Sequence, residues 1–326
     1  MVEKIYIKKF KSIKEAALKL SSLNVLIGAN GSGKSNLISL FELVNAIQAG
    51  NLDNYVMAGG GCDRFLYNGR KYSEQLNCKM EYSDGKILNL ELRPAIGDKL
   101  YVQNDADITK ELKNNVNRFM VYHFHDTSVT SSMRSACNIS DNEYLRSDAS
   151  NLAACLYRLQ HEHNRNFLLV EGIVKSVAPY FKCFKLREHP LNREMIMLEW
   201  EQDGTDAYFD AYSFSDGTLR FIALATLLLQ PIKGKTLIID EPELGLHPSA
   251  VNKIAALLRM ASNENQVLVA TQSVNLINNF DPSDIVVTDF NAGTTYRRLD
   301  QADLASWIED YSLGEIWEKN IIGGRP

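Results

Sequence analysis

One octapeptide constrains this chain more than any other stretch. Gly28-Ala-Asn-Gly-Ser-Gly-Lys-Ser35 follows the short apolar run Leu23–Ile27 and precedes a predicted helix over Asn36–Gln48. A glycine-rich turn between strand and helix directs backbone N–H groups at phosphate oxygens, while Lys34 supplies a positive charge and Ser35 a hydroxyl ligand for Mg²⁺. A merely flexible turn is the alternative, and the flanking strand and helix argue against it. The sequence therefore predicts a loop that binds ATP and Mg²⁺ through Asn30, Gly31, Ser32, Gly33, Lys34, Ser35 and Asn36.

The composition narrows the class of protein. The 326 residues, 45% hydrophobic and 23% charged, suffice for one large or two modest domains. No apolar run approaches the roughly eighteen residues of a membrane span, and Met1–Lys4 lacks the apolar core of a secretion signal, so we expect a cytoplasmic protein with no membrane contact. Five separated cysteines indicate neither disulfides nor a zinc site. The net charge of -5 argues against broad nonspecific nucleic-acid affinity, although it leaves room for a local basic groove.

The remaining pattern predicts alternating sheets and helices around this loop. Apolar alternation predicts a hairpin before the loop, and an antiparallel meander after the first helix. The expected strands are Lys4–Phe10, Ala16–Leu20, Phe65–Tyr67, Gln75–Tyr82, Ile87–Leu92, Lys99–Val102 and 118–124. Further along, we expect helices over Ala149–Leu159 and Phe167–Val177, then strands over Phe184–Glu188 and Glu194–Trp200. No seven-residue apolar repeat is sustained, which argues against a long coiled-coil arm.

The second informative region begins at Phe214-Ser-Asp-Gly-Thr218, just before the apolar helix expected at Phe221–Leu229. By itself this is a good helix start, because Ser215 can cap the helix and Asp216 suits its positive end.

Soon afterwards, the apolar run Thr236–Ile239 ends in two adjacent carboxylates, Asp240 and Glu241. Two carboxylates at the end of a buried parallel strand are costly unless they are paired or bind a ligand. Asp240 can hold Mg²⁺ through its water shell, and Glu241 can polarise the water that attacks the γ-phosphate. A solvated pair of acids is the weaker alternative once a phosphate loop is in the same chain. A further strand, Gln266–Ala270, leads to Gln272, whose side chain we expect beside the nucleotide.

Two histidines mark the end of the strand predicted over 118–124. Alternation places His123 and His125 on one face, so a transition-metal site is conceivable. Because no third ligand is nearby in the sequence, hydrogen-bonded structural histidines are the preferred interpretation.

Taken in order, the motifs resemble the ATP-binding cassette (ABC) ATPases, in the RecF, SMC and OLD-like branch rather than the membrane transporters. The matching stretches are Gly28–Asn36, Phe214–Thr218 and Leu237–Pro248. His123–Ser128 and the ending Trp317–Pro326 are similar to stand-alone prokaryotic ATPases called AAA family ATPases. The resemblance implies an α/β fold, an ABC-type P-loop ATPase head with a mixed central sheet, an antiparallel β subdomain and a helical lobe.

The resemblance also implies a homodimer with two ATP molecules sandwiched between subunits. In that arrangement Ser215 and Gly217 of one subunit contact the γ-phosphate bound by the other, and Lys11 lies near the nucleotide. The chain departs from the family pattern at Gln272, where relatives have histidine. It also lacks a Q-loop glutamine after the strand predicted over 118–124, where His125 and Asp126 are assigned a metal or water contact.

We expect a single head over 1–326, with an N-terminal lobe over 1–125, a helical insert over 126–210 and a C-terminal lobe over 211–326. The predicted function is ATP hydrolysis coupled to dimerisation, which regulates a separate effector, a nuclease, in anti-phage defence or DNA repair, with DNA as a possible ligand. The alternative is an ATP-locked dimeric scaffold with negligible turnover, which Gln272 would favour because glutamine cannot carry charge. A transporter cassette is disfavoured, since the glutamine that meets a membrane partner is missing.

Overall fold

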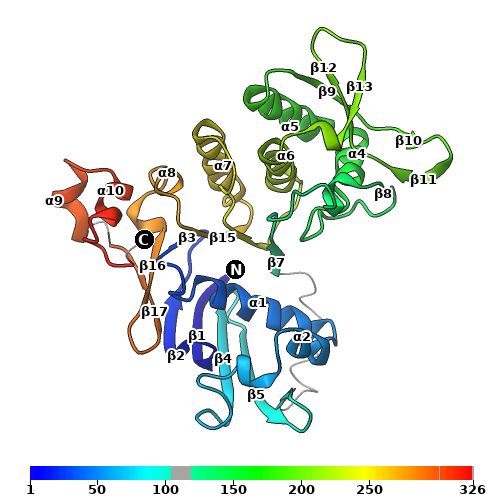
Figure 1. The fold of residues 1–326 in the computed structure, drawn as a ribbon. Coiled ribbons are helices and arrows are strands. Elements are labelled where there is room, and N and C mark those ends of the chain that lie inside the picture. The colour runs from blue at the N-terminus through cyan, green and yellow to red at the C-terminus, as the bar shows by residue number, and fades with distance from the viewer. Residues whose placement is uncertain (104–118, 301, 325–326) are drawn as a thin grey trace. The chain divides into compact units, whose positions relative to one another are not determined.

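The computed structural model describes residues 1–103, 119–300 and 302–324 (Figure 1). Two stretches named from the sequence reach outside the described residues: the strand predicted over 118–124 does so at its first residue, and the ending Trp317–Pro326 at its last two. The chain divides into two compact units, and each has its own sheets and helices. The first comprises Met1–Val121, Gly234–Ile238 and Asn265–Pro326, and the second comprises Tyr122–Lys233 and Ile239–Glu264. The predicted division into three lobes stays a prediction.

A five-stranded antiparallel sheet of order β2-β1-β4-β5-β6 forms one layer of the first unit. Its strands are β1 (Val2–Phe10), β2 (Ile13–Lys19), β4 (Leu76–Tyr82), β5 (Ile87–Ala95) and β6 (Lys99–Val102). Every second residue of β4 is buried, as in a strand with one face on the core. The predicted hairpin and meander are confirmed. The strand predicted over Phe65–Tyr67 is wrong, because the short stretch between a 3₁₀ turn and the turn at Asn68 forms only an isolated bridge from Leu66 to Phe10.

The second sheet is mixed, with the order β17-β16-β3-β15-β14-β7. Its strands are β3 (Leu23–Ile27), β7 (Phe119–Tyr122), β14 (Thr236–Asp240), β15 (Gln266–Thr271), β16 (Ile285–Phe290) and β17 (Thr294–Arg298). Strand β3 runs parallel to β15 and β16, whereas β17 is antiparallel to β16. Every residue of β3 and β15 is buried, which is typical of parallel strands covered on both faces. The predicted mixed central sheet is confirmed.

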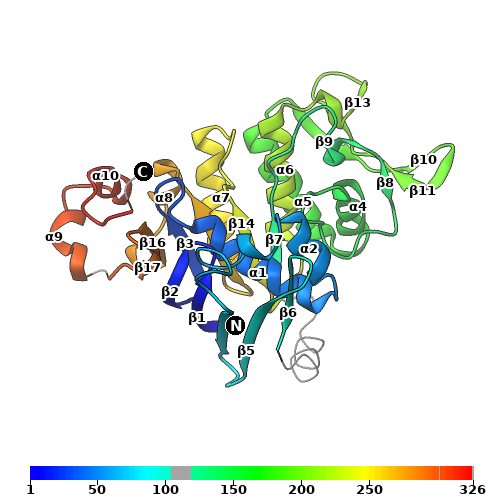
Figure 2. The same ribbon diagram turned by 60° about the horizontal axis from the view of Figure 1, so that its bottom comes forward.

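Helix α1 (Lys34–Gln48) follows β3 after the loop of residues 28–33 (Figure 2), and its apolar side chains join the core of the first unit. Leu37, Phe41 and Val44 share one hydrophobic cluster with side chains from both sheets. Phe41 also packs against Phe119 with ring centroids 4.9 Å apart. This burial holds α1 in place, and with it the N-terminal end of the helix, where the phosphate loop ends. The other helices of the first unit are α2 (Leu52–Ala58), α8 (Val274–Ile277), α9 (Ala305–Ile308) and α10 (Leu313–Glu318).

The second unit is mainly helical, as Figure 1 shows for its green and yellow helices. Its helices are α4 (Leu152–Glu162), α5 (Asn164–Val177), α6 (Asp216–Leu229) and α7 (Pro248–Ala261), and α6 packs against the other three. Two small antiparallel sheets complete it: β9 (Phe181–Lys185), β12 (Glu199–Gln202) and β13 (Tyr208–Asp210), and β8 (Cys137–Asn138), β10 (Glu188–His189) and β11 (Asn192–Ile196). The strand predicted over Glu194–Trp200 is therefore divided between two sheets.

Candidate functional site

The predicted phosphate loop connects the end of β3 to the first turn of α1. Gly33 immediately precedes the helix with a φ of 114°, a value that side chains other than glycine rarely allow. A Cβ at this position would also lie 2.3 Å from the Thr294 hydroxyl. The glycine is thus required both by backbone conformation and by the close approach of β17.

The interior of this loop suits a polyphosphate. Lys34 is 6% exposed, and its Nζ donates hydrogen bonds to the Gly28 carbonyl at 2.5 Å and the Ala29 carbonyl at 2.9 Å. The Ser32 hydroxyl is buried and has no hydrogen-bond partner within the described ranges. Open space surrounds Gly31, where an added Cβ would meet no atom within 4 Å. A cationic amine, an unsatisfied hydroxyl and an open turn fit the terminal phosphates of ATP.

Strand β17 holds the loop from outside, a role that the sequence analysis missed. Thr294 Oγ1 donates to the Ser32 carbonyl at 2.8 Å, and the Tyr296 hydroxyl donates to the Gly33 carbonyl at 3.0 Å. Burial raises the pKa of Tyr296, which keeps its hydroxyl protonated and able to donate. The hydroxyl oxygens of Ser12 and Thr294 are 2.6 Å apart. No local sequence motif indicates these contacts, because the partners are more than two hundred residues apart in the chain.

Gln272 lies beside the phosphate loop. Parallel pairing matches Thr271 of β15 with Ile27 of β3, so the residues that follow each strand emerge at the same edge of the sheet. Gln272 Nε2 donates to Asn30 Oδ1 at 2.7 Å. The glutamine is therefore in hydrogen-bond contact with a residue of the loop itself.

Lys11 contacts the helix that follows the loop. Its Nζ donates to Ser39 Oγ of α1 at 2.5 Å and lies 5.0 Å from the centroid of the Phe65 ring. Burial lowers the pKa of Lys11, and the nearby Glu42 carboxylate opposes that effect. A cavity of about 860 Å³ beside this lysine is also lined by Asn36, Arg64, Arg70 and Lys71.

Within the second unit, the paired carboxylates lie at the end of β14. Asp240 is the last residue of the strand, and Glu241 has a φ of 46°, in the left-handed region that a side chain other than glycine seldom occupies. Such strain persists only where the surrounding structure imposes it, and it is concentrated at functional positions.

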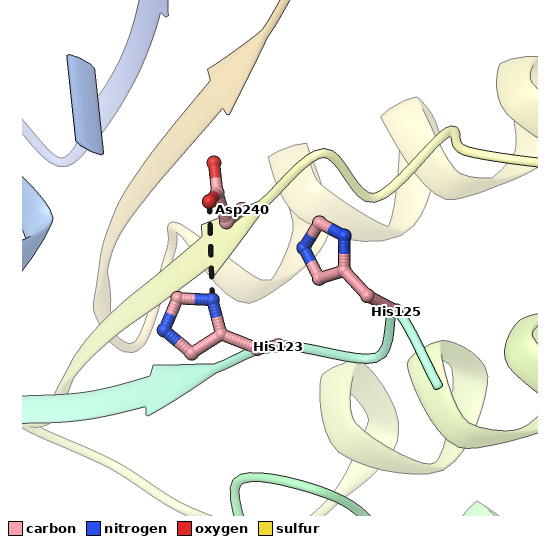
Figure 3. Close-up of side chains that lie close together, drawn as sticks. All are labelled: His123, His125 and Asp240. Carbon is pink, nitrogen blue, oxygen red and sulfur yellow. Dashed lines mark ion pairs between the residues drawn. The ribbon is translucent and has the colours of Figure 1, made fainter. Parts of the chain in front are cut away.

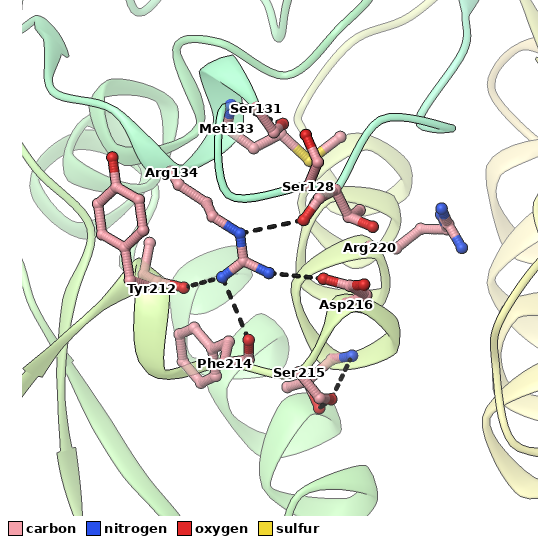
Figure 4. Close-up of polar contacts among 12 residues, drawn as sticks. Ser128, Ser131, Met133, Arg134, Tyr212, Phe214, Ser215, Asp216 and Arg220 are labelled. Atoms are coloured by element: carbon pink, nitrogen blue, oxygen red, sulfur yellow. Dashed lines mark hydrogen bonds and ion pairs between the residues drawn. The ribbon is translucent and has the colours of Figure 1, made fainter.

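The predicted capping of α6 by Ser215 is confirmed. The Ser215 hydroxyl accepts a hydrogen bond from the Thr218 N–H at 3.2 Å, and the side chain itself is exposed (Figure 4). A Cβ on Gly217 would lie 2.5 Å from the Gly245 carbonyl, so the loop after β14 approaches this turn too closely for a larger residue.

Arg134 organises the segment before α6, a second role that the sequence analysis missed. The guanidinium is buried, and it donates to the Thr127 carbonyl at 3.1 Å, the Phe214 carbonyl at 3.2 Å and the Asp216 carboxylate at 2.7 Å (Figure 4). It also donates to the Ala211 carbonyl. The sequence presents Arg134 only as part of a polar loop.

The histidines after β7 gain a third neighbour in the structure. His123 Nδ1 lies 3.8 Å from Asp240 Oδ2, and His125 belongs to the same group of side chains (Figure 3). Asp126 instead accepts hydrogen bonds from the backbone N–H and the hydroxyl of Ser128, which lower the pKa of its carboxyl group.

The predicted site residues are distributed over both units. Lys11, Gln272 and the loop residues Asn30 to Asn36 belong to the first unit, whereas Ser215, Gly217, Asp240 and Glu241 belong to the second. Of the helices that the structure describes, none has the length and apolar character needed to cross a membrane.

Comparisons with known proteins identify the family and the fold. A family model described as "AAA domain, putative AbiEii toxin, Type IV TA system" matches residues 88–278, and one described as "AAA ATPase domain" matches residues 1–88. No curated protein matches the chain.

Solved structures of Smc heads are similar to this chain at low sequence identity. One is an SmcHead bound to the C-winged helix domain of ScpA, with 18% identity, a TM-score of 0.66, and 94% of this chain and 99% of that chain covered. Another is an Smc head domain with an extended coiled coil bound to the C-terminal domain of ScpA derived from Pyrococcus furiosus, with 17% identity, a TM-score of 0.60, and 95% and 98% covered. These likenesses confirm the predicted fold class, an ABC-type head.

Proposed function

The chain belongs to the AAA-domain family whose model matches residues 88–278, and on that premise we propose that it binds and hydrolyses ATP. The observation that carries this proposal is the loop between β3 and α1, where Lys34 is buried against loop carbonyls and the Ser32 hydroxyl has no hydrogen-bond partner among the described residues. A buried hydroxyl of this kind is costly unless another group binds it, and a phosphate oxygen would do so.

The proposed roles follow from the chemistry of each side chain. Lys34 binds the β- and γ-phosphates, and Gln272 donates a hydrogen bond to the γ-phosphate. Glu241 accepts the proton of the attacking water as the general base. Ser35 and Asp240 would hold Mg²⁺ with the oxygen ligands that this ion prefers, and the ion would neutralise part of the phosphate charge.

The second part of the proposal is an ATP-dependent homodimer. Ser215 and Gly217 of one copy would contact the γ-phosphate held by the other copy. The solvent exposure of Ser215, in a turn that Arg134 holds in place, supports this role. A head that closes in this way would regulate a separately encoded effector, a nuclease, in anti-phage defence or DNA repair, with DNA as a possible ligand.

The comparisons support a function that involves a second protein. The description of the matching family names a toxin and a Type IV TA system, and both similar Smc heads are described as bound to a domain of ScpA. We infer that this chain also works with a partner protein.

A scaffold that ATP locks as a dimer, with negligible turnover, is the second candidate. Gln272 favours it, because glutamine can donate a hydrogen bond to Asn30 or to phosphate but cannot carry the charge of a protonated histidine. Steady-state phosphate release separates the two functions. The ATPase proposal expects multiple turnovers by the wild type and almost none by Glu241→Gln, whereas equal and negligible release by both proteins would support the scaffold.

A further inference from the structure

Two imidazoles and one carboxylate converge in the second unit. The ligand atoms of His123, His125 and Asp240 all lie within 4.8 Å of one another (Figure 3). The two histidines flank a single residue just after β7, and Asp240 ends β14. The side chains of His123 and Asp240 are 37% and 17% exposed, and His125 is exposed, so an ion from solvent can reach all three.

The surrounding backbone holds the two histidines on one side. Tyr122 and Phe124 occupy the alternating positions, and both are buried, with ring centroids 5.6 Å apart. His123 is only partly buried and His125 is exposed, so both side chains are directed away from this buried aromatic pair. The two imidazole rings lie 6.0 Å apart between centroids.

Arg220 of α6 fixes the same segment through its backbone. Its guanidinium donates to the Phe124 carbonyl at 2.6 Å and to the His125 carbonyl at 3.0 Å. It also donates to the Leu244 carbonyl in the loop after β14. One buried side chain thus ties the segment that carries the histidines to the loop that follows Asp240, which fixes the spacing of the three ligand groups.

We propose that His123, His125 and Asp240 form a binding site for a divalent transition-metal ion such as Zn²⁺ or Co²⁺. Imidazole nitrogens suit these ions, whereas Mg²⁺ takes oxygen ligands. Two donors bound at about 2.1 Å to a tetrahedral ion lie about 3.4 Å apart. The 3.8 Å separation of His123 Nδ1 from Asp240 Oδ2 needs only a small side-chain rotation to reach this value.

Three protein ligands leave at least one coordination position for water or another oxygen donor, as in open rather than closed zinc sites. The site would share Asp240 with the proposed Mg²⁺ ligand set, but its two nitrogen donors give it a different metal preference. Its existence can be tested on protein without nucleotide, so it does not depend on ATP hydrolysis.

Co²⁺ titration of the chelator-stripped full chain, in excess Mg²⁺ and followed by visible absorption, tests the site. We expect one equivalent to bind with the d–d bands of a nitrogen-ligated ion, and Zn²⁺ to displace it. His123→Gln and His125→Gln should each weaken binding by more than about ten-fold, since even the loss of an outer-shell partner costs that much. Asp240→Asn should also weaken it.

His161→Gln is the matched control, because it removes an exposed imidazole of α4 that bonds the Tyr157 carbonyl and belongs to no ligand cluster found among the described residues. It should bind Co²⁺ like the wild type. Thermal unfolding without metal checks that each variant is folded. Substitution of the exposed His125 should leave the unfolding temperature unchanged. The proposal is overturned if the wild type shows no saturable binding, or if the two histidine variants bind as tightly as His161→Gln.

Discussion

Lys34 is the residue whose environment most directly indicates a ligand. Its amine is buried against two carbonyls of the phosphate loop, and both of these oxygens are neutral acceptors. A nearby anion lowers the cost of burying a positive charge, so the terminal phosphates of ATP would stabilise the buried amine.

Lys34→Ala should therefore weaken ATP binding by at least about a hundred-fold, the loss expected when a charged hydrogen bond worth about 3 kcal/mol is removed. Calorimetric titration with a non-hydrolysable ATP analogue measures the effect. Lys233→Ala, which removes a lysine that is 72% exposed and paired with Glu264, is the control and should bind normally. Unchanged affinity in Lys34→Ala would refute the assignment of the loop.

Gln272→Ala should lower ATP turnover by about ten- to a hundred-fold, because a hydrogen bond to developing charge on the γ-phosphate is lost. Its contact with Asn30 means that the substitution also frees a loop side chain. We expect Gln272→Glu, which keeps the size but replaces the donor with a negative charge, to be at least as slow, because the carboxylate would also repel the phosphate. Wild-type phosphate release from Gln272→Ala would leave the glutamine with no role beyond its contact to the loop.

Some residues of the candidate site can be read from the sequence, and others cannot. Lys34 and Ser215 lie in contiguous motifs whose spacing fixes their local geometry, namely a loop before a helix and a helix cap. Arg134 and Thr294 act through partners far along the chain, at Asp216 and Ser32. Their positions depend on how the units fold, and no pattern of neighbouring residues reveals that.

At the scale of elements, the turn before α6 depends on a single buried guanidinium. Arg134 connects Thr127, Ala211, Phe214 and Asp216, so the exposed cap at Ser215 is held by interactions on its buried side. Without this support, the turn would lose the rigidity that precise contact with a phosphate requires.

Arg134→Lys should therefore uncouple the turn from ATP binding. Lysine has a shorter reach and a single amine, so several of the carbonyls would lose their donor, at a cost of about 1–3 kcal/mol for each one left unsatisfied. We expect nearly unchanged nucleotide affinity but a large loss of turnover and of dimerisation. Arg146→Lys, at a guanidinium that is 60% exposed and paired with Asp141, is the control. Normal turnover in Arg134→Lys would show that the turn is not part of the catalytic cycle.

Element boundaries show the same division between local and distant causes. The periodicity of Gln75–Tyr82 predicts β4 almost to the residue, since alternate burial is visible in the sequence. Glu194–Trp200 instead contributes to two strands, β11 and β12, which belong to different sheets. Its pairing partners at Cys137 and Phe184 lie in different parts of the chain. Strand propensity indicates extended backbone but not which neighbour it pairs with.

At the scale of the molecule, the proposed ATPase cycle requires residues from both units. Glu241→Gln keeps the side-chain size but removes the proposed general base, so ATP would bind and persist. We expect this variant to accumulate as an ATP-dependent dimer with two-fold symmetry. Light scattering with and without ATP measures the change in mass.

Ser215→Arg gives the complementary result for the same interface. An arginine at the exposed cap should block the approach of a second copy while leaving the phosphate loop intact, so ATP binds but neither dimer nor turnover follows. Glu241→Gln that remains monomeric in ATP, or full activity in Ser215→Arg, would contradict the two-ATP dimer.

The proposed effector would need an accessible surface on this chain. Closure around ATP can alter another activity only if that activity contacts the open and closed states differently. Of the aromatic residues near the C-terminus, Trp317 is fully buried and donates to the Gly324 carbonyl, so it belongs to the core. Trp307 is 40% exposed beside Tyr311, and Leu168 on α5 is 56% exposed, so both remain accessible to a partner.

We therefore expect the native protein, purified from its own host, to carry the product of an adjacent gene, and we expect that product to have nuclease activity. Glu241→Gln, by holding the ATP-bound state, should change the partner's activity by more than about five-fold, the lower range of coupling between two sites. With Lys34→Ala, the partner's activity should stay at the level found without nucleotide, whether or not ATP is added. A preparation that contains only this chain and cleaves DNA by itself in an ATP-dependent way would contradict a separate effector, and would place the nuclease centre within these 326 residues.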